Sequence, residues 1–389
     1  MSSEQSTWLR RMVPRDPTEH HRVATPLELL FDLCFVVAIA QAAAHLHHAV
    51  SEAHLAHGLI GYLSAFFAIW WAWMNLTWFA SAFDCDDVPY RLLVLLQIGG
   101  VLVLAAGVPR AFDAGDFTVI TIGYAIIRVA MIALWLRAAL AGPTTRVPAT
   151  RYALGIGVCQ IGWISLLFLP ENVRPWGFPV MVVCELIVPI WAERTNTTAW
   201  HPHHIAERYG LLTLIVLGES VLSATQAVQM ALDANAPAAK LLTLSAGGLL
   251  ILASIWWIYF AQPAAYILRS TRTAFVWGYG HFAIFASLAA IGAGLAVVAD
   301  EAAGKSHIER SAAGAAVAVP VAVHLMSVWF AHVRPHVSSK RPGIAFGMAT
   351  IGVLLTPLLP AGVLIVGLIL AALVAGLPRA RSCATDSKI

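Results

Sequence analysis

The sequence predicts an all-α membrane protein, a helical bundle with about twelve spans. Of its 389 residues, 59% are hydrophobic and only 12% are charged, whereas a soluble domain carries about 25% charged residues. Its apolar residues are gathered into runs long enough to cross a bilayer, and its basic residues fall between those runs. These features exclude a soluble domain of any size.

A helix needs roughly 20 apolar residues to cross the hydrocarbon core. Charges, prolines and polar clusters divide the chain into twelve apolar runs: 26–46, 57–82, 91–109, 117–137, 152–169, 176–192, 206–230, 240–262, 274–298, 312–332, 342–357 and 360–378. The last two runs are short. Residues 342–378 therefore form either two full spans or a re-entrant hairpin broken at Pro357 and Pro360.

The positions of the basic residues predict the orientation. With the N-terminus in the cytoplasm, eighteen of the 24 Lys and Arg lie on the cytoplasmic side, five lie on the opposite side and Arg128 lies within a span. This is the positive-inside bias of membrane proteins. We expect a protein of the bacterial inner membrane, with residues 1–25 as a cytoplasmic N-terminal segment and residues 379–389 as a cytoplasmic tail.

A repeated motif predicts two six-helix halves, 26–192 and 193–378. Ile69-Trp70-Trp71 and Ile255-Trp256-Trp257 each lie in the second span of their half. Two parallel repeats would place a substrate site at their interface, as in many transporters. The alternative is a chance recurrence in a chain with 14 tryptophans.

Four charged residues within the first six predicted spans are candidates for function. Glu28 and Asp32 are four residues apart, and hence on one helix face, in the first span. Arg128 and Glu185 lie near the midpoints of the fourth and sixth spans. Ionisable groups within a bilayer cost several kcal/mol and are therefore candidates for function.

The seventh span adds a polar stripe. His204 lies at its cytoplasmic entrance, Glu207 and Arg208 follow, and Glu219 is eleven residues beyond Arg208 on nearly the same helix face. One hypothesis is a proton or cation pathway through these acids, with Arg128 or Arg208 as counter-charge. The other is a set of structural ion pairs, such as Asp32 with Arg208 and Glu185 with Arg128.

Histidines and tryptophans form further groups that allow two interpretations each. The histidines near residues 45–57 and 201–204 could either bind a metal or be interfacial polar residues. Because their spacing is irregular, no metal site is predicted. For His281 and His324 the two alternatives are proton exchange and packing through hydrogen bonds. The tryptophans of the second span line a pocket or pack between helices; they are Trp70, Trp71, Trp73 and Trp78.

No motif indicates a cofactor or a familiar enzyme. The chain has no phosphate-binding loop, dinucleotide fingerprint, GxSxG or HExxH pattern. Its net charge of +3, without a basic stripe, does not indicate nucleic-acid binding. The expected partners are the lipid bilayer and a small solute or ion, and the oligomeric state stays open.

Two stretches resemble a known family. They are TPLELLFDLCFVVAIAQ at 25–41 and HIAERYGLLTLIVLGESV at 204–221, and both are similar to signature segments of the bacterial low temperature requirement A (LtrA) family. The family's usual Phe-Phe-Asp-Leu-Val-Phe is Leu-Phe-Asp-Leu-Cys-Phe here. The resemblance implies a multi-pass inner-membrane protein linked by name to growth in the cold. It selects Glu28, Asp32, His204, Glu207, Arg208, Gly218 and Glu219 as functional residues.

The leading functional hypothesis is a secondary transporter or a proton- or cation-translocating protein, with a polar site between the first and seventh spans. A second hypothesis is an integral-membrane enzyme that acts on a lipid or isoprenoid. A third is a membrane sensor or assembly factor. Transport would give coupled flux, an enzyme would change the lipid profile, and a sensor would do neither.

Overall fold

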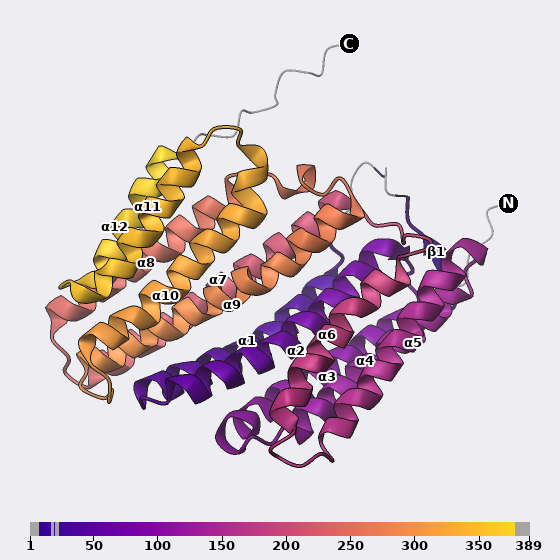
Figure 1. Cartoon of the computed structure of the whole chain (residues 1–389), viewed down its shortest axis with the longest axis horizontal. Coiled ribbons are helices and arrows are strands. Elements are labelled where there is room, and N and C mark those ends of the chain that lie inside the picture. Colours follow the sequence, from indigo (N-terminus) through magenta and orange to yellow (C-terminus); the bar gives the residue numbers. More distant parts are fainter. Residues whose placement is uncertain (1–7, 17–18, 20–22, 378–389) are drawn as a thin grey trace, which may run out of the picture. The chain divides into compact units, whose positions relative to one another are not determined.

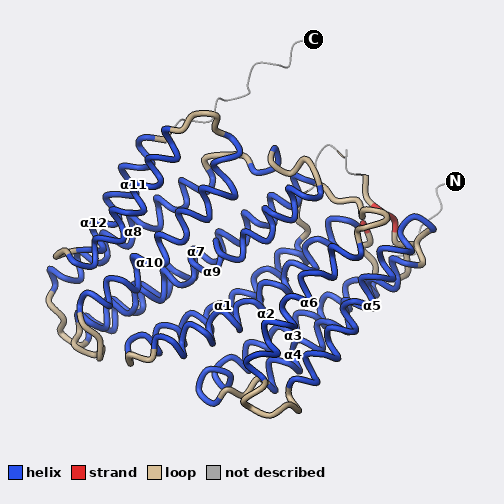
Figure 2. The backbone as a smooth tube through the Cα atoms, in the orientation of Figure 1, coloured by secondary structure: helices blue, strands red, loops and turns tan. Residues whose placement is uncertain are grey.

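The computed structural model describes residues 8–16, 19 and 23–377, and nearly all of them are helical (Figures 1 and 2). The predicted tail 379–389 and parts of the predicted segment 1–25 lie outside the described residues. The first six α-helices are α1 (Pro26–Ser51), α2 (Leu55–Ala82), α3 (Val88–Ala114), α4 (Thr118–Ala139), α5 (Pro143–Leu166) and α6 (Arg174–Ala192). The other six are α7 (Pro202–Asp233), α8 (Ala238–Phe260), α9 (Thr271–Ala302), α10 (Arg310–Val328), α11 (Arg341–Leu355) and α12 (Gly362–Gly376).

Every predicted span coincides with a helix, which confirms the all-α class. Ten helices of the described chain are long and apolar enough to cross a membrane, and the protein is a multi-pass membrane protein. The prediction began the fifth span at residue 152, but α5 begins at Pro143. Its first turns are polar, so a search for apolar runs misses them. The helices α5 and α12 are not among these ten. At about 1.5 Å per residue, the 15-residue α12 is shorter than the hydrocarbon core, and the exact number of spans stays a prediction.

The chain divides into two compact units. Unit 1 contains residues 1–42 and 61–211, and unit 2 contains residues 43–60 and 212–389. The helices α1, α2 and α7 therefore each contribute residues to both units. The repeat remains a prediction, and its two motifs have different surroundings: Trp70 and Trp71 are 3% and 1% exposed, whereas Trp256 and Trp257 are 45% and 56% exposed.

Close backbone contacts hold the helices of unit 1 together. A Cβ atom added to Gly100 would lie 2.8 Å from the carbonyl oxygen of Gly123, so α3 and α4 approach too closely for larger residues. Small residues at such crossings are typical of membrane helices. Farther along α4, the Trp135 ring stacks on Tyr152 of α5 with 4.1 Å between centroids.

The N-terminal segment of unit 1 is tied to the helix ends. The two-residue strands β1 (Val13–Pro14) and β2 (Phe83–Asp84) pair antiparallel. Asp87 caps α3 by accepting the backbone N–H of Tyr90 at 2.9 Å. The same buried carboxylate accepts the N–H of Arg10 at 2.9 Å and pairs with Arg137 at 2.6 Å. This end of unit 1 is thereby fixed by charge-assisted hydrogen bonds.

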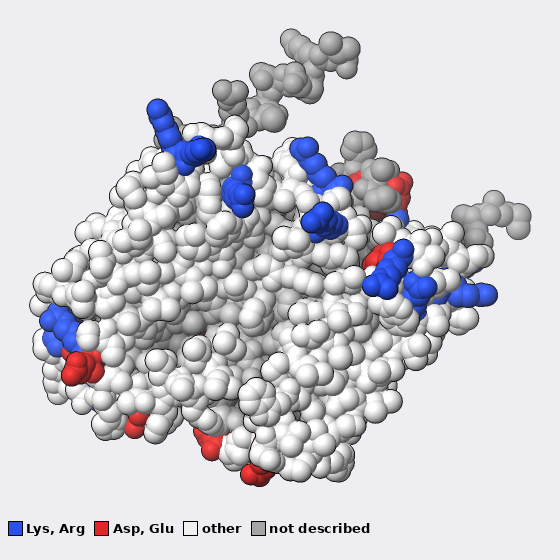
Figure 3. All heavy atoms as spheres, viewed as in Figure 1, with Lys and Arg blue, Asp and Glu red and all other residues white. Residues whose placement is uncertain are grey.

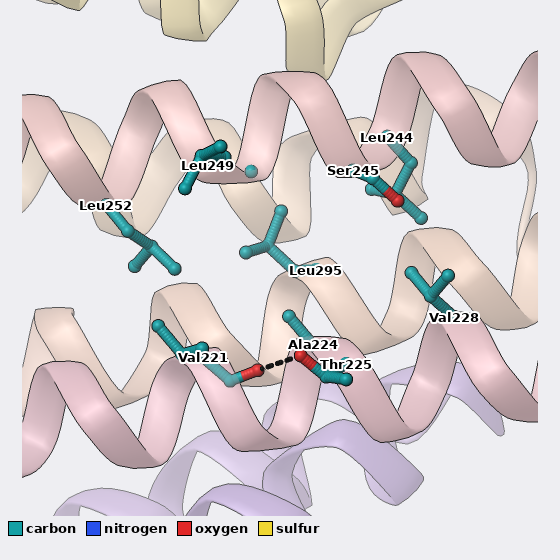
Figure 4. Close-up of a pocket in the computed structure, with 10 residues that line it drawn as sticks. Val221, Ala224, Thr225, Val228, Leu244, Ser245, Leu249, Leu252 and Leu295 are labelled. Carbon is teal, nitrogen blue, oxygen red and sulfur yellow. Dashed lines mark hydrogen bonds between the residues drawn. The ribbon is translucent and has the colours of Figure 1, made fainter.

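In unit 2, α9 is the central helix and is buried over most of its length. Gly294 of α9 packs on the backbone of Ala316 in α10, and Gly247 of α8 packs on Leu364 in α12. An apolar groove of about 210 Å³ lies among α7, α8 and α9 (Figure 4). Its lining has no ionisable side chain, and its Thr225 hydroxyl donates to the Val221 carbonyl at 2.8 Å. The groove therefore offers no charged side chain to a ligand.

Charged side chains lie at the helix ends. On the face shown in Figure 3, Lys, Arg, Asp and Glu gather near these ends, and the flanks between them carry uncharged residues. This distribution suits helices whose flanks contact hydrocarbon. Four ionisable side chains within the helices are buried, namely Asp32, Arg128, Glu185 and Arg208.

Candidate functional site

The first functional stretch forms the start of α1. Thr25 is the N-cap: its hydroxyl accepts the Glu28 N–H at 3.3 Å, and Glu28 Oε2 accepts the Thr25 N–H at 2.7 Å. This reciprocal pair is a capping box, and Pro26 occupies the first helical position, where proline is favoured. Oε2 of Glu28 therefore caps the helix, while Oε1 contacts side chains of α7.

The buried centre of unit 1 is an ion-pair cluster between α1 and the first turns of α7. Arg208 donates from Nε to Asp32 Oδ2 at 3.0 Å and from Nη2 to Asp32 Oδ1 at 2.5 Å. Its Nη1 lies 3.2 Å from Glu28 Oε1, and His204 Nε2 lies 3.2 Å from the same oxygen. Asp32, His204 and Arg208 are fully buried and Glu28 is 3% exposed. We call these four residues the acid–arginine cluster.

Helical spacing explains why these four side chains meet. Glu28 and Asp32 are four residues apart on α1, and His204 and Arg208 are four residues apart on α7. Side chains at this spacing share a helix face. Each helix therefore presents two ionisable groups one turn apart, and the bidentate guanidinium fixes their register.

Aromatic residues complete the cluster, and sequence analysis missed their role. Trp73 of α2 donates its indole N–H to Asp32 Oδ1 at 2.7 Å. Its ring meets the Tyr209 ring edge-on at 4.9 Å, and Trp78 donates to the Tyr209 hydroxyl at 3.0 Å. The tryptophans of α2 thus act as hydrogen-bond donors as well as packing groups. Their spacing alone carries no sign of this role.

The start of α7 is held against α2. The N–H of His201 donates to the Ser81 hydroxyl at 3.0 Å, and the His201 imidazole accepts the N–H of His204 at 3.3 Å. His201 thereby caps the helix that carries His204 and Arg208. This contact positions the basic half of the acid–arginine cluster.

Charged groups of both signs meet in the acid–arginine cluster. Two carboxylates, Glu28 and Asp32, contact the Arg208 guanidinium, and His204 lies beside Glu28. Ionisable groups in such contact alter one another's affinity for a proton.

A cavity leads toward this cluster from one end of unit 1. It has a volume of about 430 Å³, and its lining includes Glu28, Thr25, Arg15, Arg91 and Asp86. Two hydrogen bonds from Arg91 hold the pKa of Asp86 below its usual range. The cavity thus joins charged groups at the helix ends to the outermost carboxylate of the acid–arginine cluster.

A second buried cluster lies between α2, α4, α5 and α6 of unit 1. Arg128 pairs with Glu185 at 3.0 Å, and both are 1% exposed. Glu185 also accepts the indole N–H of Trp71 at 2.9 Å and of Trp163 at 3.0 Å. Tyr124 accepts from Arg128 and donates to Glu185 at 3.4 Å. The carboxylate and the guanidinium are balanced here, which suits a structural ion pair.

A buried amide in unit 1 yields a stability prediction. Gln160 of α5 is 7% exposed, and neither end of its side-chain amide has a hydrogen-bond partner in the described part of the chain. An unsatisfied buried polar group costs about 1–3 kcal/mol. We expect Gln160→Leu to stabilise the protein by about 1 kcal/mol, measured as a higher unfolding temperature in detergent. A lower unfolding temperature would show that the amide is hydrogen-bonded, for example by water.

The remaining candidates lie elsewhere. Glu207 is half-buried on α7, one residue before Arg208 and hence turned away from it around the helix. Glu219 belongs to unit 2, is half-buried and accepts from the Ser223 hydroxyl at 3.0 Å. The structure therefore unites four of the eight predicted residues, pairs Arg128 with Glu185, and leaves Glu207 and Glu219 outside both clusters.

Two ion pairs involve the predicted histidine-rich segment 45–57. His47 pairs with Asp300 of α9 at 2.6 Å, and Glu52 pairs with His307 at 3.1 Å. Groups of three or more side chains suited to a metal ion do not occur in the described ranges. These residues connect the end of α1 to the far end of α9.

A family model described as "Bacterial low temperature requirement A protein (LtrA)" matches residues 23–377. The chain belongs to the LtrA family. This match confirms the resemblance found in the two sequence stretches and supports a bacterial cell-membrane location. A relative described as an uncharacterized protein of Rhizobium meliloti (strain 1021) is 26% identical over 301 residues, 73% of this chain and 70% of the relative. No solved structure matches the chain.

In this LtrA protein the two signature stretches meet through their charged residues. The first stretch, 25–41, supplies Glu28 and Asp32, and the second, 204–221, supplies His204 and Arg208. Asp32 and Arg208 are 176 residues apart in the sequence. The acid–arginine cluster is therefore formed by the two segments that carry the family resemblance.

A buried thiol beside the α3 cap gives a second prediction. Burial, together with the charge of Asp87, raises the pKa of Cys85 to about 11. The thiolate is the reactive form, so Cys85 stays protonated at neutral pH. We expect its alkylation by iodoacetamide to be slow and to rise steadily between pH 7 and 9, measured by peptide mass spectrometry with the denatured chain as reference. A rate that levels off within this range would contradict the prediction.

Proposed function

We propose that this LtrA protein is a secondary transporter or ion-translocating protein driven by protons, with the acid–arginine cluster as its proton-binding site. The observation that carries the proposal is the buried contact of two carboxylates, Glu28 and Asp32, with Arg208, in which His204 lies 3.2 Å from Glu28. Chains of acidic and histidine residues within membrane spans are typical of proton relays. The transported solute would be a small molecule or an ion.

The surroundings of Glu28 support an exchange of protons with water. Glu28 is the outermost acid of the acid–arginine cluster and lines the 430 Å³ cavity. Its Oε1 lies 3.2 Å from Nε2 of His204, and an imidazole is a group that can take up and release a proton. Protonation of His204 or Glu28 would change the electrostatic interaction of this pair with Arg208. It would thereby change the contact between α1 and α7.

Reconstitution in liposomes tests the proposal. Purified protein is incorporated with a pH-sensitive dye inside the vesicles, and a potassium diffusion potential drives proton entry. We expect flux above that of empty vesicles for the wild type and a loss of flux for Asp32→Asn. Glu28→Gln is the sharpest variant, because glutamine can still accept the Thr25 N–H of the capping box while its charge is lost.

A matched control and two contrary outcomes complete the experiment. Glu171→Gln removes an exposed acid between α5 and α6 and should leave the flux unchanged. Wild-type flux equal to that of empty vesicles would overturn the proposal, as would full flux in Asp32→Asn. A changed membrane lipid profile on deletion, without flux, would favour the alternative of a lipid- or isoprenoid-modifying enzyme.

A further inference from the structure

Unit 2 contains four histidines that do not belong to the acid–arginine cluster and that lie in or directly after α9 and α10. His281 belongs to α9 and His324 to α10. His332 lies in a π-helical turn, Trp329–Val333, and His336 ends the following 3-10 turn, Arg334–His336. We call them the histidine file. His281, His324 and His332 are at most 1% exposed, whereas His336 is half-exposed.

The π-helical turn sets the position of His332. Such turns insert one residue into a helix and are frequent at functional sites. Here the turn places the His332 ring against Tyr259 of α8, stacked at 4.6 Å, and lets Nε2 donate to the Gln262 carbonyl at 3.2 Å. The His281 ring lies 6.4 Å away, centroid to centroid.

The hydrogen bonds define which ring nitrogens carry protons. His281 Nδ1 lies 2.7 Å from the Trp277 carbonyl and must donate, so Nε2 accepts from the Tyr259 hydroxyl at 3.0 Å. His324 Nδ1 contacts the Ile284 carbonyl at 3.3 Å. The opposite nitrogens, His324 Nε2 and His332 Nδ1, have no hydrogen-bond partner in the described residues. Each can therefore accept a proton without breaking an existing bond.

His336 lies at the exposed end of the histidine file between two carbonyl groups. Its Nδ1 lies 2.9 Å from the His332 carbonyl, and its Nε2 lies 3.2 Å from the Pro263 carbonyl. Both neighbours are acceptors, and a neutral imidazole has only one N–H. Both hydrogen bonds exist together only when His336 is an imidazolium. Two carbonyl oxygens thus face the two ring nitrogens of His336 at the half-exposed end of the file.

The interior of the histidine file contains no counter-charge. The titratable groups that act on its three buried rings are the other histidines of the file, and Tyr259 from α8 hydrogen-bonds to one of them. Carboxylates are not among these groups in the part of the chain that the structure describes. An imidazolium there would be unstable, so the buried rings suit passage of a proton rather than its storage.

We propose that the histidine file is a proton-transfer path into unit 2, which enters at His336 and passes His332 and His281 to His324. In each step one imidazolium loses a proton to water between the rings, and that water gives a proton to the lone pair of the next ring. The donor ring becomes neutral. When His281 takes the proton at Nε2, the Tyr259 hydroxyl no longer donates to that nitrogen and turns to accept from it. This path lies in unit 2 and does not depend on the acid–arginine cluster of unit 1.

Deuterium exchange at the imidazole Cε1 position tests this path independently of transport. This slow exchange requires a ring that becomes protonated and is reached by water, and peptide mass spectrometry measures it for each histidine. The full-length protein in lipid nanodiscs is incubated in deuterated buffer near pH 7. We expect exchange at His332, His281 and His324, although these rings are buried.

The variant His332→Phe should abolish exchange at His281 and His324, while His336 keeps its rate. His57→Phe, an exposed site in unit 2, is the matched control and should change neither. Absence of exchange at His281 in the folded wild type would overturn the proposal without any variant. Exchange at His281 that stays equal or rises in His332→Phe would also overturn it, because it would come from unfolding.

Discussion

Arg208→Ala is expected to be the most destabilising substitution in unit 1. It leaves Asp32 and Glu28 buried without a guanidinium, and removing one partner of a buried ion pair costs about 3–5 kcal/mol. Asp32→Asn should cost less, because Arg208 keeps its contact with Glu28 at 3.2 Å. The unfolding temperature of purified protein in detergent, together with the yield of monodisperse protein, measures this order.

Two controls separate the lost ion pair from the lost side chain. Arg146→Ala removes an exposed arginine of α5 and should have little effect. The double variant Asp32→Asn/Arg208→Gln should be less destabilised than the sum of its single variants, because residues in contact are not additive. Strict additivity, or equal effects of Arg208→Ala and Arg146→Ala, would contradict the pairing seen in the structure.

Gly294→Leu is expected to prevent the packing of α9 against α10. A Cβ atom at this position overlaps the backbone carbonyl of Ala316, and a backbone atom cannot move aside without shifting its helix. Overpacking of a tight contact costs about 1–3 kcal/mol and occasionally more, and leucine adds further atoms to the same overlap. We expect loss of most of the folded protein, measured by size-exclusion chromatography after extraction.

Gly248→Leu is the matched substitution in α8. The nearest atom to its added Cβ is a side-chain methyl of Leu295 at 3.5 Å, and Gly248 lines the apolar groove of Figure 4. A leucine here has room and should be tolerated. Equal yields for the two variants would mean that the α9–α10 contact does not limit folding.

The sequence by itself determined the helices and the buried charges. Apolar runs of the length of a span set where helices form, and the twelve predicted runs coincide with α1 to α12. The same runs made Asp32, Arg128, Glu185 and Arg208 conspicuous, because an ion in hydrocarbon needs a partner or a use. The pairs Asp32 with Arg208 and Glu185 with Arg128, considered from sequence, are both present.

The tertiary structure alone decided which helix faces meet. It assigned Trp73 to Asp32 and Trp71 to Glu185 as hydrogen-bond donors, gave Glu28 both a capping and an ionic contact, and left Glu219 with Ser223. The physical reason is that the periodicity of a helix sets which side chains share a face. The neighbour of that face depends on packing between segments far apart in the chain. Local sequence therefore identified the buried ions, and only the packing of α1, α2 and α7 within unit 1 determined what surrounds them.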